Sequence, residues 1–130
     1  MIVLDASAAV EWLLGRPRAE AVERRLVEGT PSLHAPHLLA VEVAQVLRRF
    51  QLQGLLGADR GALALADLAD LGVTTYPHEP LLPAIWQLRE NFSAYDAAYV
   101  ALAAALRAPL VTLDARLAAG PHGIDVDLIE

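Results

Sequence analysis

Four of the sixteen acidic residues occupy positions where a carboxylate calls for an explanation. Asp5 and Asp114 each follow a short apolar run and precede a run of helix-forming residues, whereas Glu42 and Asp96 lie inside otherwise apolar helical stretches. An ionised carboxylate among apolar neighbours is costly unless it is paired or binds a metal ion. These four residues are therefore the first candidates for chemistry.

Together, four carboxylates could hold a hard divalent cation such as Mg²⁺ or Mn²⁺, which prefers oxygen ligands in octahedral geometry. Such a group repels itself strongly when it is empty, and a bound cation would turn it into a site that attracts phosphate. That would allow a chain of net charge −6 to act on RNA or DNA. Spacing alone does not show that the four side chains converge.

Each acid also has a purely structural interpretation. The two acids that follow strands could be N-caps, a device worth about 1 kcal/mol. Ser93 and Asp96 have the spacing of a capping box, with Asp in place of Glu, and Glu42 could reach solvent or pair with an arginine such as Arg49. Capping and catalysis are compatible, so these interpretations do not exclude an active site.

The elements that must position these acids alternate along the chain. Short apolar or β-branched runs predict strands at 2–4, 32–35, 73–76, 110–113 and, as an edge strand, 124–129. Periodic segments between breakers predict helices at 6–14, 18–28, 37–53, 58–71, 80–91, 93–107 and 114–119. Such alternation implies a parallel sheet covered on both faces, and ligands collect beyond the carboxyl ends of such strands. Asp5 and Asp114 are therefore expected at the same edge of the sheet.

Composition removes several other kinds of chemistry. The 130 residues predict a single domain over 1–130. No cysteine is present, which excludes disulfides, thiolate metal sites and cysteine nucleophiles. All ten basic residues are arginine, which excludes Schiff-base lysines and the P-loop lysine. The longest uncharged apolar run, 97–106, is half of the ~20 residues that span a membrane, and the N-terminus does not read as a signal peptide, so we expect a cytoplasmic protein.

The four acids lie in segments that resemble the motifs of PIN-domain ribonucleases. The opening strand-to-helix motif is VLDASA at 3–8, and the second acidic motif, on a long helix, is VEV at 41–43. The third is YDAAYVALA at 95–103, and the fourth is LVTLD at 110–114, including the threonine two residues before the acid. All four occur in order over the whole chain, and the compact length resembles VapC-type toxins of bacterial and archaeal toxin–antitoxin modules.

The resemblance implies a three-layer α/β/α sandwich around a parallel sheet of about five strands and an endoribonuclease that depends on Mg²⁺ or Mn²⁺. It implies that the catalytic, metal-binding acids are Asp5, Glu42, Asp96 and Asp114. Ser7 and Thr112 would hold water molecules or form hydrogen bonds to the acids without binding the metal ion themselves. The resemblance further implies an RNA substrate, cleavage to 5′-phosphate and 3′-hydroxyl ends, a cognate antitoxin and homodimerisation.

Other functions remain as alternatives. A non-catalytic PIN-like module that binds RNA or protein is the main one, although four intact acids argue against it. A receiver-type phosphoacceptor normally needs a lysine, and a D-x-D phosphatase needs a second Asp that 5–7 lacks. Late on the helix that carries the second acidic motif, Arg48 and Arg49 could contact RNA phosphate or form a solvated face. The same choice applies to Arg16 and Arg18, which flank a proline.

Overall fold

The computed structural model describes residues 1–130. Five strands form one parallel sheet in the order β3-β2-β1-β4-β5. The strands are β1 (Ile2–Leu4), β2 (Leu33–Pro36), β3 (Thr74–Tyr76), β4 (Leu110–Thr112) and β5 (Val126–Leu128). The register places Val3 of the central strand opposite both His34 and Leu110. The predicted parallel sheet of about five strands is confirmed.

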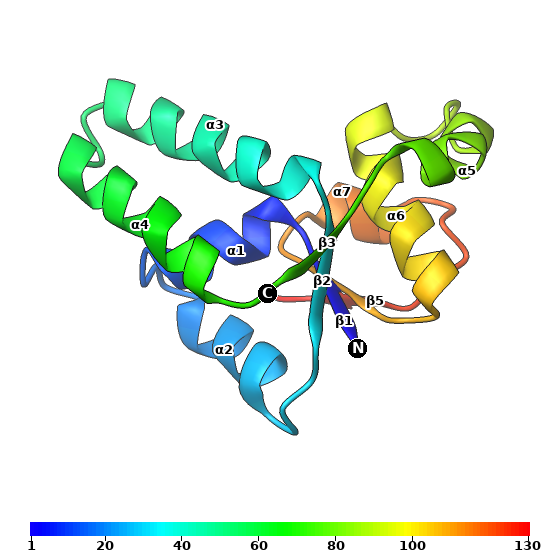
Figure 1. The fold of residues 1–130 in the computed structure, drawn as a ribbon, viewed down its shortest axis with the longest axis horizontal. Coiled ribbons are helices and arrows are strands. Elements are labelled where there is room, and N and C mark those ends of the chain that lie inside the picture. The colour runs from blue at the N-terminus through cyan, green and yellow to red at the C-terminus, as the bar shows by residue number, and fades with distance from the viewer.

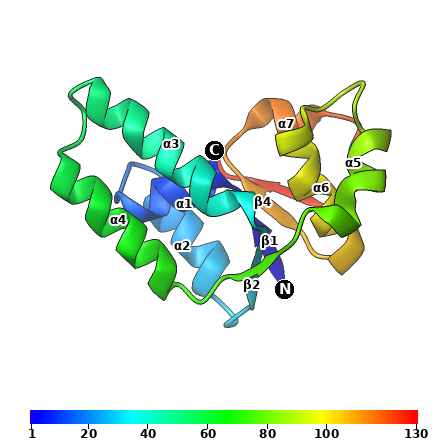
Figure 2. The ribbon, with the colours of Figure 1, turned by 45° about the horizontal axis from the view of Figure 1, so that its top comes forward.

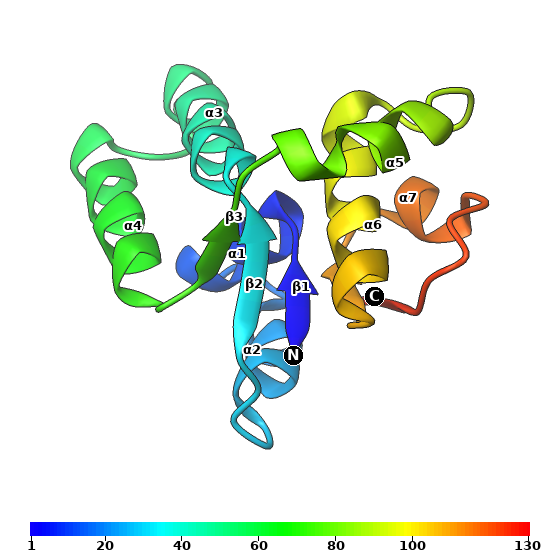
Figure 3. The same cartoon turned by 45° about the vertical axis from the view of Figure 1, so that its right-hand side comes forward.

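Helices cover both faces of this sheet. They are α1 (Ala6–Leu13), α2 (Ala19–Val27), α3 (Leu38–Leu52), α4 (Ala58–Asp70), α5 (Leu82–Gln87), α6 (Ala94–Leu106) and α7 (Ala115–Ala119), with a 3₁₀ turn η1 (Glu79–Leu81) before α5. The first four helices lie on one side of the sheet, and α5 and α6 lie on the other (Figures 1 and 3). Helices α3 and α4 run side by side as a hairpin, and both contact α1 (Figure 2). The three-layer α/β/α prediction is confirmed.

The core lies where the central strands meet α6. Residues 97–103 of α6 are all buried, and this helix contacts β1, β2 and β4. A helix that is apolar on all sides must be enclosed, which explains why such an alanine-rich segment lies directly on the sheet. No helix combines the length and the apolar character needed to cross a bilayer.

The strand order determines where a ligand can enter. The chain runs outward from β1 through β2 to β3, then returns to the opposite side of β1 as β4 and β5. The direction of winding therefore reverses between β1 and β4, and ligand crevices of parallel sheets open at such a reversal. Asp5 directly follows β1 and Asp114 lies two residues after β4, so both acids lie at the same edge of the sheet, as the sequence predicts, and the strand order adds that this is the reversal.

Most predicted bounds differ from the structure by a single residue, and the helix predicted at 80–91 and the edge strand predicted at 124–129 differ by more. The helix predicted at 80–91 is η1 followed by the short α5. It ends early because the Trp86 carbonyl accepts both the backbone N–H of Arg89 at 3.3 Å and its Nη1 at 2.8 Å, which turns the chain. Strand β4 stops at Thr112 because the N–H of Leu113 donates to Ser7 Oγ instead of a strand carbonyl. The edge strand covers only 126–128.

Candidate metal-binding and active site

Asp5 is a buried carboxylate fixed by three donors. It is the N-cap of α1, and its Oδ1 accepts the Ala8 N–H at 3.0 Å and the Ser7 hydroxyl at 2.6 Å. Its Oδ2 accepts the hydroxyl of Thr112. Burial raises the pKa of Asp5, and nearby Asp114 raises it further, whereas the three hydrogen bonds lower it. The predicted cap is confirmed, but capping alone does not account for a carboxylate that is only 7% exposed.

Two hydroxyls connect the ends of β1 and β4. Ser7 Oγ accepts the Leu113 N–H at 2.9 Å and lies 3.3 Å from Thr112 Oγ1. Thr112 Oγ1 in turn accepts the Asp114 N–H at 3.0 Å. Thr112 is fully buried, so both hydroxyls hold the backbone that carries Asp5 and Asp114 in a fixed relation. The structure thus places Ser7 and Thr112 directly behind the acids.

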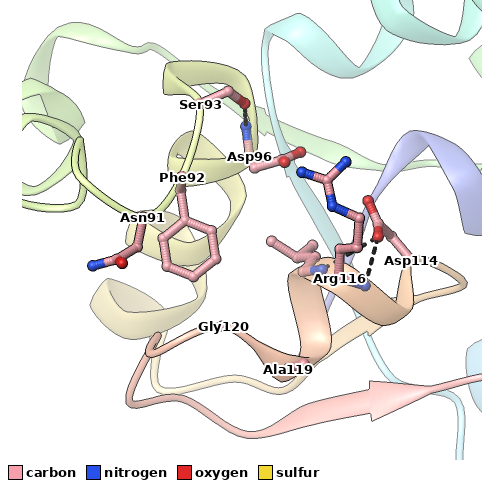
Figure 4. Close-up of a pocket in the computed structure, with 9 residues that line it drawn as sticks. Asn91, Phe92, Ser93, Asp96, Asp114, Arg116, Ala119 and Gly120 are labelled. Atoms are coloured by element: carbon pink, nitrogen blue, oxygen red, sulfur yellow. Dashed lines mark hydrogen bonds between the residues drawn. The ribbon is translucent and has the colours of Figure 1, made fainter.

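Asp114 and Asp96 face a common cleft of about 620 Å³ (Figure 4). Asp114 is the N-cap of α7, and its Oδ1 accepts the Arg116 N–H at 2.9 Å. Asp96 lies in the first turn of α6, where its N–H donates to Ser93 Oγ at 3.1 Å, as the capping spacing predicts. Burial and then Asp114 raise the pKa of Asp96, while Ser93 and the nearby Arg116 guanidinium lower it. Two acids from distant segments therefore share one opening.

Glu42 reaches this group from the opposite layer. The hydroxyl of Tyr99 donates to Glu42 Oε1 at 2.7 Å, and Tyr99 lies one turn after Asp96 on α6. Burial raises the pKa of Glu42, and Asp96 and Asp5 raise it further, although the Tyr99 hydrogen bond lowers it. Burial and Glu42 likewise raise the pKa of Tyr99. No ion pair joins Glu42 to Arg49, the partner that the sequence allowed.

Tyr99 is the residue of this site that the sequence analysis did not select. Its signal was available, because a tyrosine three residues after Asp96 shares the same side of an otherwise alanine-rich helix. Its partner lies 57 residues away, however, and only the approach of α3 to α6 brings the two together. The site therefore extends beyond the four acids and two hydroxyls of the motifs.

The four acids form an open acidic centre in which Arg116 is the one basic side chain near enough to lower a pKa, that of Asp96 (Figure 4). Asp5, Glu42 and Asp96 each feel the repulsion of another member of the group, and none of the four takes part in an ion pair. No three His, Asp or Glu side chains lie close enough together to enclose an ion. The donor set is nonetheless all oxygen and strongly negative, which suits a hard divalent cation, and such a charge would relieve the repulsion.

Comparison with known proteins identifies the family to which this chain belongs. The PIN domain family model matches residues 2–122. Ribonuclease VapC9 of Mycobacterium tuberculosis is 49% identical over 117 residues, which cover 90% of this chain and 88% of the relative. The chain therefore belongs to the PIN-domain family and, within it, to the VapC ribonucleases.

Solved structures show the same fold at low sequence identity. The crystal structure of M. tuberculosis VapC20, a sarcin-ricin loop cleaving toxin, superimposes with a TM-score of 0.71 at 18% identity, covering 92% of this chain and 94% of that one. VapBC2 from Rickettsia felis, solved with a DNA fragment from its promoter, has a TM-score of 0.71 at 13% identity, with 100% of both chains covered. These two neighbours support the PIN-like architecture.

Proposed function

We propose that this protein is a metal-dependent endoribonuclease that hydrolyses RNA phosphodiester bonds and acts as the toxin of a toxin–antitoxin pair. The proposed ligands for Mg²⁺ or Mn²⁺ are Asp5, Glu42, Asp96 and Asp114. One observation carries the proposal: three of these carboxylates have a pKa raised by burial and mutual repulsion, and none of the four forms an ion pair. Close relatives named as ribonucleases support the same reaction.

The proposed reaction is hydrolysis at a phosphorus atom. A divalent cation bound at the acids supplies Lewis-acid activation of a water molecule and positive charge opposite the phosphodiester. The water oxygen bonds to phosphorus, the bond to the 3′ oxygen breaks, and that oxygen takes up a proton. The products are a 5′-phosphate and a 3′-hydroxyl, and no lysine, cysteine or histidine nucleophile is required.

The protein's own hydrogen bonds prepare the acids for this role. Ser7, Thr112 and the N–H of Ala8 hold the Asp5 carboxylate in one orientation. Tyr99 occupies only Oε1 of Glu42 and so leaves Oε2 available to a ligand. Outer hydrogen bonds of this kind typically contribute about 10- to 100-fold to metal affinity or activity.

Partner binding is the second part of the proposal. The VapBC2 assembly supports an antitoxin partner for this chain, and exposed Leu82 and Trp86 on α5 offer apolar surface for a homodimer. An apolar cleft that contains exposed Val41 and Tyr95 also contains Glu42. An antitoxin segment in this cleft would cover an active-site acid directly. The proposal also includes a cytoplasmic location, which an RNA substrate would favour.

An RNA cleavage assay tests the proposal. We expect the purified chain to cut RNA when Mg²⁺ or Mn²⁺ is present and to stop when EDTA is added. Asp96→Asn should abolish cutting, whereas Asp67→Asn, which neutralises an exposed acid on α4, should cut like the wild type. Equal cleavage by Asp96→Asn would contradict the assignment. RNA binding without cleavage would instead favour the non-catalytic module.

A further inference from the structure

A third cleft adjoins the acids and is lined by several basic side chains. Its volume is about 320 Å³, and its lining includes Ser7 and Asp114 from the acidic centre. The same lining contains Arg16, Arg18 and Arg49, three of the ten basic residues in a chain of net charge −6. Basic side chains thus gather beside the acids of a protein that is acidic overall.

Two of these arginines are held in place by a buried acid. Glu11 of α1, whose side chain is 5% exposed, accepts Arg16 Nε at 3.2 Å through Oε2 and lies 3.5 Å from Arg18 Nε through Oε1. The Arg16 guanidinium also lies 4.9 Å from the centre of the Phe50 ring. Both arginines contact Glu11 through Nε, and their Nη groups form no hydrogen bond with the protein, so those donors remain available to a ligand.

The third arginine enters the cleft from α3. Arg49 follows Glu42 by seven residues, which puts it on the same side of the helix about 10 Å further along the axis. It is exposed and forms no ion pair. Its neighbour Arg48 is also exposed but does not line the cleft. The two adjacent arginines therefore differ in the side of α3 on which they lie, and only Arg49 lies on the side that faces the cleft.

We infer that the cleft of Arg16, Arg18 and Arg49 binds a backbone phosphate of the RNA strand next to the phosphate at the acids. The inference rests on the proposed ribonuclease function. Guanidinium groups bind phosphate through charge-assisted hydrogen bonds, and phosphate contacts fix the register of a nucleic acid without reading its sequence. Glu11 is then a positioning residue that aims two of the three guanidinium groups.

Salt-dependent RNA binding tests this inference. We would measure the fluorescence anisotropy of a labelled single-stranded oligouridylate with Asp96→Asn protein, which keeps the probe uncut, over a series of KCl concentrations. Adding Arg49→Gln should weaken binding and reduce the slope of log K against log salt by about 0.7, the value for one contact to a single strand. Adding Arg48→Gln, the matched control, should change neither quantity.

The opposite results would overturn the inference. Equal effects of Arg48→Gln and Arg49→Gln would mean that only net charge matters, and no binding by the parent protein would remove the site altogether. Unchanged RNA binding by Arg49→Gln would leave an acidic protein segment as the occupant. Because the assay needs no cleavage, each of these results is distinct from failure of the proposed function, which would appear as uncut RNA with wild-type protein and metal.

The role of Glu11 can be tested by whether Glu11→Gln strengthens or weakens RNA binding. Glu11→Gln removes a negative charge from a phosphate-binding cleft, so simple electrostatics would strengthen RNA binding. A positioning role requires weaker binding, because Arg16 and Arg18 lose their anchor. We expect weaker binding at a temperature where circular dichroism shows a folded protein, and stronger binding would overturn the positioning role.

Discussion

Helix α1 begins at one buried carboxylate, that of Asp5, and carries a second, that of Glu11, six residues later. The two carboxylates have different surroundings. Glu11 is 4% exposed and lies against two arginines of the following loop. Asp5 is 7% exposed, receives only hydroxyl and N–H donors, and lies near further acids. The chain compensates the charge of Glu11 with its own arginines, whereas Asp5 has no such compensation, and our proposal assigns that role to a bound metal ion.

This difference separates an arrangement that supports folding from one that costs stability. A buried acid without a countercharge costs stability, and groups with strongly perturbed pKa values cluster at functional sites. Arginines occur within the neighbouring cleft, so the absence of an ion pair at Asp5 does not reflect a shortage of cations nearby. Under the proposed function, the acidic centre gives up stability in order to bind a metal ion.

Neutralising each acid of α1 in turn would test the comparison most severely. Asp5→Asn should lower kcat for RNA by about a thousandfold, since metal-ion stabilisation of the transition state is worth several kcal/mol. Glu11→Gln should leave kcat within about tenfold and mainly raise KM, because it loosens only arginines. Steady-state kinetics on one RNA substrate would decide. Similar kcat values for the two variants would contradict the different roles assigned to Asp5 and Glu11.

The buried hydroxyl behind Asp5 gives the next largest effect. Thr112→Val keeps the shape of the side chain but removes its bonds to Asp5 and to the Asp114 N–H. We expect activity to fall about 10- to 100-fold and the free energy of unfolding to fall by about 1–3 kcal/mol, because buried polar groups lose a partner. Thr112→Ser, which keeps the hydroxyl, should recover most of both. Parallel kinetics and urea unfolding would measure them, and a Ser variant as impaired as Val would point to packing instead.

A smaller loss of activity is expected from breaking the hydrogen bond between Tyr99 of α6 and Glu42 of α3. Tyr99→Phe keeps the buried ring but releases Glu42 Oε1. Activity should fall about tenfold, in the range of outer contacts to a ligand, and higher Mn²⁺ concentrations should restore part of it. Activity titrated against Mn²⁺ would reveal this. A loss as large as that of Asp5→Asn would place the hydroxyl among the catalytic groups.

The smallest expected effect is on stability against pH. The pKa values of Asp5, Glu42 and Asp96 are raised in the fold, so the folded protein holds these protons more tightly than the unfolded chain, whose carboxyl pKa values are near 4. Their stabilisation is present below that range and is lost as pH rises through the raised values. Without metal, Asp5→Asn should therefore have a higher Tm than wild type at pH 7, and the difference should close towards about pH 4.

Glu11→Gln is the matched control for this pH series. Removing a carboxylate that faces two arginines offers no relief, so its Tm at pH 7 should not exceed that of wild type. Differential scanning calorimetry in EDTA over this pH range would show both trends. A gap between Asp5→Asn and wild type that does not depend on pH would contradict the electrostatic explanation.

Part of the site could be predicted from short segments of the sequence. Asp5 and Asp114 follow apolar strands and begin helices, and the alternation of elements placed both at one edge of a parallel sheet. The capping relation of Ser93 to Asp96 was also local, since it spans a single helical turn. Each of these features depends on a few consecutive residues, which is why the motifs predicted them.

Features that depend on tertiary approach could not be read in the same way. The sequence offered solvent or Arg49 as the partner of Glu42, but Arg49 lies two turns away on the same helix and Tyr99 arrives from another layer. The sequence likewise left Arg16 and Arg18 beside a proline without naming an acid to meet them. The loop turns back at Gly15, which has a φ of +62°, and only that reversal returns the arginines to α1.

Metal-dependent stability is the most direct test of the central claim, and it requires no knowledge of the RNA. Thermal unfolding would be measured with and without millimolar Mn²⁺ for wild type, Asp96→Asn and the exposed control Asp67→Asn. A cation at 100 times its Kd stabilises by ~2.7 kcal/mol, which is a shift of several degrees at this size. The structure predicts that rise for wild type and Asp67→Asn and its loss in Asp96→Asn. No rise in wild type, or the same rise in Asp96→Asn, would contradict a metal site built from these acids.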